Sequence, residues 1–186
     1  MVPLTQIWLP IVVAAVFVFV ASSLIHMVVK WHNSDYRPLP NEEAVLDAIR
    51  KGAPGPGQYT FPYCADLKEM GKEETRKKFE RGPMGFVYLT TPGLPNMGKL
   101  LGSWFLLNLV VSFCVGYLVS RTVAPGTPYL QVFRVAGTVT FLAYAVGTVP
   151  NAIWMGKPWK VTLKEIVDGL VFGLVTAGAY GWLWPR

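Results

Sequence analysis

Four long runs of apolar residues constrain this chain more than any other feature. The first, Ile7 to Val29, contains no Lys, Arg, Asp or Glu. At about 1.5 Å of rise per residue, a helix of that length exceeds the roughly 30 Å hydrocarbon core of a bilayer. Three further apolar runs occupy about 100–119, 129–150 and 162–183. The sequence therefore predicts an all-α integral membrane protein with four transmembrane helices.

Composition supports this prediction and divides the chain into three parts. The sequence is 52% hydrophobic and 15% charged, whereas soluble domains carry about 25% charged residues. Because no Lys or Arg precedes the first run, and because it is longer than the roughly 7–15 apolar residues of a signal peptide, we expect it to be retained. The predicted parts are helix 1 in 1–29, a polar extramembrane loop in 30–99, and helices 2–4 in 100–186.

The long polar loop carries signals for both helices and strands. Asn41, two glutamates, two basic residues and Gly52 predict a short helix with a capped start and a glycine stop. A second, charged helix is predicted from Asp66 to Arg81, where each of two glutamates is followed by a lysine four residues later. Residues 58–61 and 86–90 are expected to be extended. The loop is thus predicted to be an α+β segment.

Charge placement predicts the orientation of the spans. The short third connection carries Lys157, Lys160 and Lys164, whereas the opposite side carries only Arg121 and Arg186 near span ends. Short cytoplasmic loops are enriched in Lys and Arg. We therefore expect the third connection and the long loop to be cytoplasmic, with both termini on the periplasmic side.

Two ionisable residues, Arg134 and Asp168, are predicted at membrane depth, where an unpaired charge is costly. Counting helical rise puts them about 15 Å apart in depth, so we do not expect a salt bridge between them. Asp168 is expected to lie near His26, with Asn151 and Lys164 at a similar level. This cluster has two interpretations: a proton-linked or ligand-binding site, or a hydrogen-bonded lock between helices.

The remaining buried polar candidates have mainly structural interpretations. Arg134 is expected to reach the outer headgroups, and Asn108 to form a bridge between helices. His26 raises the alternative of an axial ligand for a pigment or haem. With His26 and His32 as the only histidines, and two separated cysteines, no metal site is predicted.

Small residues recur at four-residue steps along two of the spans. Such ridges allow close helix approach, either within the four helices or against another subunit. The predicted ridge residues are Gly169, Gly173, Ala177 and Gly181 in the fourth span, with Ser112 and Gly116 in the second.

Several chemical functions lack support in the sequence. No nucleophile with a base and an orienting partner, no phosphate-binding glycine loop and no paired carboxylates within a span are recognisable. The charged stretch Lys72–Arg81 mixes signs, which argues against nucleic-acid binding. We predict no certain cofactor, contacts with lipid, and no enzymatic activity.

The C-terminal third carries a resemblance. The stretches Asn151–Trp159, Asp168–Leu170 and Thr176–Pro185 resemble a family of small, uncharacterised four-span bacterial inner-membrane proteins. The resemblance implies a bacterial inner-membrane location and no particular activity.

Two main functional hypotheses follow. The first is a non-catalytic accessory or structural subunit of a larger membrane complex, of photosynthetic or respiratory type, with other membrane protein subunits and lipids as partners. The alternative is a small oligomeric transporter or ion-conducting protein that uses Asp168 and His26, with Asn108 along the path. A lipid-acting membrane enzyme has the least support, since Cys64 and His32 show no recognisable partner pattern.

Overall fold

The computed structural model describes residues 1–186, apart from the side chain of Leu67. The chain divides into two compact units, which are described separately. The membrane unit comprises Met1–Tyr36 and Pro95–Arg186, and the loop unit comprises Arg37–Leu94.

The membrane unit contains four helices that are long and apolar enough to cross a bilayer. They extend over Trp8–Val29, Met97–Thr122, Tyr129–Trp154 and Trp159–Leu183. The prediction of a four-span, mostly helical protein with a mixed loop between the first two spans is confirmed. The chain is thus a multi-pass membrane protein.

Regular α-helix covers most of these spans. The helices are α1 (Trp8–Ser23), α5 (Met97–Thr122), α6 (Tyr129–Tyr144), α7 (Val149–Trp154) and α8 (Trp159–Leu183). Helix α5 begins before the apolar run because Asn96 caps it, its side chain accepting a hydrogen bond from the Lys99 amide at 3.0 Å.

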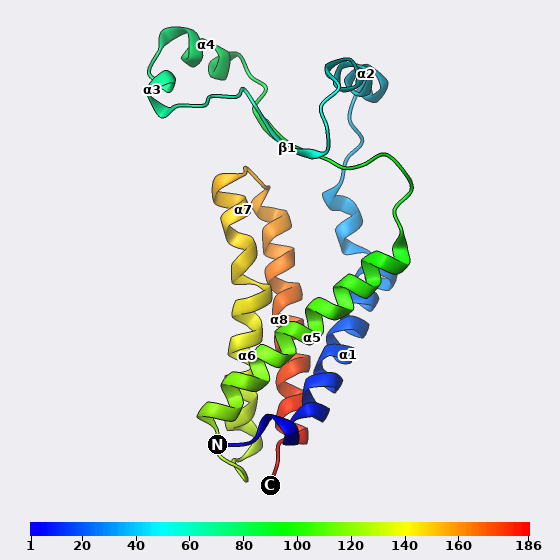
Figure 1. The fold of residues 1–186 in the computed structure, drawn as a ribbon, viewed down its shortest axis with the longest axis vertical. Coiled ribbons are helices and arrows are strands. Elements are labelled where there is room, and N and C mark those ends of the chain that lie inside the picture. Colours follow the sequence, from blue (N-terminus) through cyan, green and yellow to red (C-terminus); the bar gives the residue numbers. More distant parts are fainter. The chain divides into compact units, whose positions relative to one another are not determined.

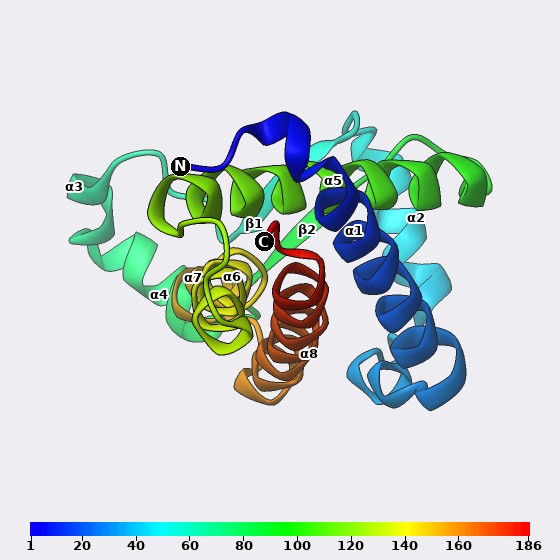
Figure 2. The same cartoon turned by 90° about the horizontal axis from the view of Figure 1, so that it is seen from below.

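In the membrane unit, α8 lies between α6 and α1, while α5 crosses these helices at an angle (Figures 1 and 2). Both termini lie at the same end of this unit (Figure 1), as an even number of spans requires. The Val2 amide donates to the Ser120 carbonyl at 3.1 Å. At the same end, the Trp184 indole donates to the Ala124 carbonyl at 2.9 Å. These bonds fix the two terminal segments to the end of α5.

Two of the four spans depart from α-helical geometry. After α1 the chain continues as a π-helical turn, Leu24–Val29, then adopts a left-handed conformation at Lys30 (φ 56°) and forms the 3₁₀ turn Trp31–Asp35. In the third span, the 3₁₀ turn Val146–Thr148 separates α6 from α7. Pro150 explains this second interruption, because it has no N–H and its ring clashes with the carbonyl four residues earlier.

The loop unit contains short elements around a two-stranded sheet. Its elements are α2 (Glu42–Gly52), β1 (Gly57–Phe61), α3 (Leu67–Met70), α4 (Glu73–Arg81) and β2 (Gly85–Leu89). The strands are antiparallel, with Tyr59 opposite Val87.

The prediction of one helix from Asp66 to Arg81 is wrong, because α3 ends at Met70 and α4 begins at Glu73. Gly71 is a weak helix former, and the two acidic residues after Lys72 favour a new helix N-terminus.

Candidate functional site

A polar cluster joins α8 to the segment that follows the first span. His32 Nε2 lies 2.7 Å from Asp168 Oδ2, and His32 Nδ1 lies 2.8 Å from Asp35 Oδ2. Since a carboxylate oxygen only accepts, each ring nitrogen of His32 is placed to donate a hydrogen bond to a carboxylate. Asp168 is 5% exposed, and its bond to His32 is partly buried.

Lys164, one helical turn before Asp168, holds the other side of the same segment. Its ammonium donates to the Trp31 carbonyl at 2.7 Å and to Ser34 Oγ at 2.9 Å, and forms an ion pair with Asp35. The hydrogen bond from Lys164 holds the pKa of the Asp35 carboxyl below its usual value; burial opposes this shift, and His32 adds to it. The chain at residues 31–35 is therefore fastened to α8 by several charge-assisted bonds.

His26 completes the cluster from the π-helical turn. Its ring stacks on that of His32, with centroids 4.9 Å apart and planes 9° apart. His26 Nδ1 lies 2.9 Å from the Ser22 carbonyl oxygen, which can only accept, so Nδ1 is the donor of this bond and Nε2 is not used in it. One donor atom each from His26, His32 and Asp168 lie within 4.8 Å of one another.

A cavity of about 290 Å³ opens at this cluster. A Lys157–Glu165 ion pair lies at its wall. Among the described residues, Asp168 Oδ1 and Glu165 Oε2 are buried oxygens with no hydrogen-bond partner. The cavity therefore combines room for a small ligand with unsatisfied acceptors.

The predicted cluster around Asp168 is partly corrected. Asp168 is buried, but its hydrogen-bond partner is His32 rather than His26. Lys164 belongs to the cluster. Asn151 is exposed, and its backbone carbonyl accepts a hydrogen bond from the Lys157 amide. His26 is also exposed in this chain. Asn151 and His26, predicted as buried polar residues, are thus exposed in this chain, where Asn151 lies on the short α7 and His26 on the π-helical turn.

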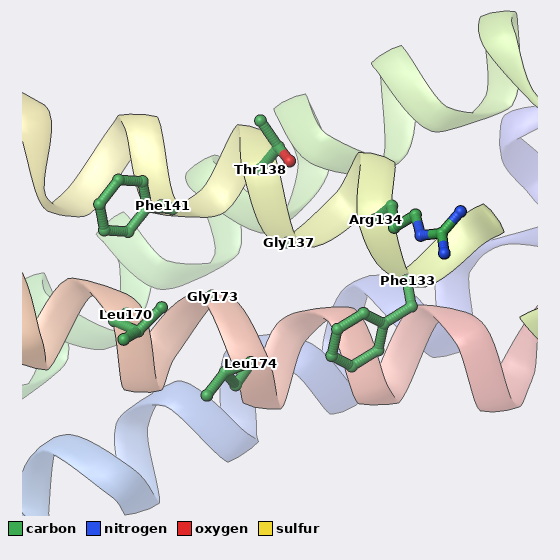
Figure 3. Close-up of a pocket in the computed structure, with 8 residues that line it drawn as sticks. All are labelled: Phe133, Arg134, Gly137, Thr138, Phe141, Leu170, Gly173 and Leu174. Atoms are coloured by element: carbon green, nitrogen blue, oxygen red, sulfur yellow. The ribbon is translucent and has the colours of Figure 1, made fainter. Parts of the chain in front are cut away.

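Arg134, also predicted to be buried, is exposed. It lies at one end of a cavity of about 310 Å³ between α6 and α8, with Phe141 at the other end (Figure 3). Gly137 and Gly173 lie between them and also line the cavity. That Arg134 reaches the outer headgroups stays a prediction.

Asn108 is buried and links α5 to α6, where its Oδ1 accepts a hydrogen bond from the Tyr144 hydroxyl at 2.8 Å. Further along α5, Tyr180 of α8 donates to the Ser112 carbonyl at 2.6 Å. A Cβ on Gly116 would lie 2.8 Å from the same hydroxyl oxygen. Ser112 and Gly116 thus contribute to the contact of α5 with α8.

The small-residue ridge of α8 faces α6 inside this chain. A Cβ on Gly169 would lie 2.7 Å from Ala145 Cβ, and one on Gly173 would lie 3.2 Å from the Gly137 carbonyl oxygen. Ala177 is fully buried, and a Cβ on Gly181 would meet the Tyr129 ring. Because α6 covers this ridge, these small residues make contacts inside this chain.

A second candidate site lies in the loop unit. A cavity of about 840 Å³ is bordered by α2, by both strands and by the chain before α2. Its apolar lining residues include Leu39, Val45, Tyr59, Phe61 and Val87. None of the residues 37–94 whose side chains the structure describes is buried. The loop unit therefore presents an apolar groove without a core beneath it.

Sequence reasoning missed His32 and Asp35 as site residues. Their three-residue spacing, and the four-residue spacing of Lys164 and Asp168, place each pair on one side of a turn. These spacings were the available signal, but the left-handed turn at Lys30 that brings the two pairs together has no marker such as glycine.

Comparison of the chain with protein-family models, with characterised proteins and with solved structures finds no match. The resemblance to small bacterial inner-membrane proteins therefore stays a prediction.

Proposed function

We propose that this chain is a non-catalytic subunit of a larger bacterial membrane assembly, and that its loop unit binds a partner protein. One observation carries this proposal. Within residues 37–94, no described side chain is buried, yet the unit has a large apolar groove. The assembly that we propose is a photosynthetic or respiratory complex.

Exposed apolar area in the groove is the driving force for this interaction. Leu39 is 53% exposed, Phe61 42%, Tyr59 38% and Val45 37%. Apolar patches of this kind on an extramembrane surface mark interaction sites. Burying apolar area contributes about 25 cal/mol per Å², so covering the groove stabilises both the complex and the loop unit. A protein segment with apolar side chains is the occupant that supplies this burial.

The attachment of the loop unit suits a docking role. The chain enters it directly after residues 31–35, which Lys164 and Asp168 hold against α8 through His32 and Asp35. These bonds fix the point where the chain leaves the membrane unit.

We also propose that the loop unit is cytoplasmic and that the membrane is the bacterial inner membrane. Support comes from Lys157, Lys160 and Lys164 at the end of the bundle where the long loop emerges. A membrane-impermeant maleimide tests the orientation on Cys64 in a Cys114→Ser background. Cys64 should react in inverted vesicles and stay unlabelled in intact cells; labelling of intact cells would reverse the orientation.

The function is tested by purification from native membranes in mild detergent, with chemical crosslinking and mass spectrometry. Val87 and Tyr88 offer a matched pair, because alternate residues of β2 face opposite sides and Val87 lines the groove. Val87→Lys should abolish recovery of the partner, while Tyr88→Lys should retain it. Both variants must reach the membrane at wild-type levels.

Other outcomes would contradict the proposal. A wild-type chain that purifies alone as a stable monomer, without crosslinks from the loop unit, would refute the subunit role. A homo-oligomer without other subunits would instead favour the ion-conducting alternative.

A further inference from the structure

We propose that His26, His32 and Asp168 bind a divalent first-row transition metal ion at the end of the bundle. One donor atom from each residue lies within 4.8 Å of the others. Two imidazoles and one carboxylate form a ligand set that suits zinc and ferrous iron. This inference is independent of the partner proposed for the loop unit.

Both histidines are already oriented as metal ligands usually are. A ligating histidine generally donates its second ring N–H to a carboxylate or a backbone carbonyl, which fixes the tautomer and the ring. His32 Nδ1 lies 2.8 Å from Asp35 Oδ2, and His26 Nδ1 lies 2.9 Å from the Ser22 carbonyl oxygen. In His26, Nε2 is therefore the nitrogen that faces an ion, and in His32 it is the nitrogen that now bonds to Asp168 Oδ2.

Asp168 supplies a second, independent indication of a ligand. It is 5% exposed, and its Oδ1 is a buried oxygen without a hydrogen-bond partner among the described residues. An unsatisfied buried acceptor is costly. A cation next to Oδ1 removes this cost, and the carboxylate lines the cavity where the cation would lie.

Binding requires only small changes around the ion. The metal takes the place of the proton between His32 Nε2 and the Asp168 carboxylate, whose Oδ2 lies 2.7 Å from that nitrogen, and the proton is released to solvent. Because the two histidine rings are stacked in parallel, the exposed His26 ring must tilt toward Asp168. Three protein ligands leave at least one coordination position open toward the cavity of about 290 Å³.

Asp35 and Lys164 support this site without touching the ion. Asp35 accepts from His32, and the Lys164 ammonium holds Asp35. Removing such an outer partner typically lowers metal affinity about 10- to 100-fold. Asp35→Asn should therefore weaken binding by about this factor, and loss of a direct ligand should weaken it more.

The test uses the full chain, purified in detergent with a tag that contains no histidine and stripped with chelator. Co²⁺ is titrated while its visible absorption is recorded, and Zn²⁺ is then added as competitor. We expect one Co²⁺ per chain, displaced by Zn²⁺, and no competition from Ca²⁺, which prefers six to eight oxygen ligands.

Variants locate the ion. His26→Ala, His32→Ala and Asp168→Asn should each lose the Co²⁺ spectrum, whereas Asn33→Ala, an exposed position in the same segment, should retain it. His26→Ala is the decisive variant, because His26 makes no hydrogen bond to Asp35, Asp168 or Lys164, so its replacement removes none of their hydrogen bonds. Unchanged binding in His26→Ala, or no binding by the wild-type chain, would overturn the proposal.

Discussion

The contact between α6 and α8 predicts a position-specific response to adding one methyl group. Gly169 and Gly178 both lie on α8. A Cβ on Gly169 would lie 2.7 Å from Ala145 Cβ and 2.8 Å from the Ala145 amide nitrogen. The nearest atom to a Cβ on Gly178 is the Tyr129 hydroxyl, at 3.8 Å. Gly169→Ala therefore causes a clash with backbone, and Gly178→Ala does not.

The size of the effect follows from comparing the two variants. Both gain the same helix propensity, about 1 kcal/mol for Gly to Ala, so this contribution cancels. Carbon atoms pack best at about 3.5–4.0 Å, so α6 must move by about 1 Å to accept Gly169→Ala. Overpacking of this kind costs about 1–3 kcal/mol. Gly169→Ala should thus be less stable than Gly178→Ala by about that amount.

The assay is unfolding in a fixed mixture of mild detergent and increasing SDS, followed by tryptophan fluorescence. Gly178→Ala should match or exceed the wild-type midpoint, and Gly169→Ala should fall below both. Equal midpoints for the two variants would refute the reasoning, because they would mean that α6 and α8 are not in close contact at Gly169.

Three further variants probe other contacts. Tyr180→Phe removes the donor to the Ser112 carbonyl at 2.6 Å and should cost about 1–3 kcal/mol in the same assay; a wild-type midpoint would contradict the bond. Gly116→Ala places a Cβ 2.8 Å from that hydroxyl oxygen and should also destabilise, but less in a Tyr180→Phe background, where the oxygen is absent. Lys164→Met should accelerate amide hydrogen exchange in residues 31–35 while leaving α2 unchanged, as measured by mass spectrometry; unaltered exchange there would show that Lys164 does not hold the segment.

Physical signals in the sequence were sufficient to predict the four spans and α2. Length and hydropathy determine the spans, because a helix must bury its backbone polar groups across the whole hydrocarbon core. The start and end of α2 match its acidic first turn and glycine-containing end, although Asn41 adopts a left-handed conformation and makes no side-chain cap. Local chemistry thus predicted the element even where the capping detail differed.

The candidate site was predicted only in part. Asp168 was identified because a buried carboxylate needs partners. Its partner was inferred by counting helical rise along a straight first span, and this count placed His26 beside it. The chain instead reverses at Lys30, which brings His32 back to α8. Arg134 and Asn151 were placed inside the bundle by depth alone, without information on which side of each helix faces its neighbours. Such information depends on tertiary packing.

The bond between His32 and Asp168 also has a consequence for biosynthesis, because 136 positions of the chain separate the two residues. When the first three spans have been synthesised and inserted, both histidines and Asp35 are already present in the chain. The Asp168 carboxylate, which bonds His32 to the last helix, is not. Until α8 inserts, residues 31–35 have no lysine or aspartate of α8 to hold them. The hydrogen bonds that join this cluster to α8 can therefore form only after the final span has been inserted.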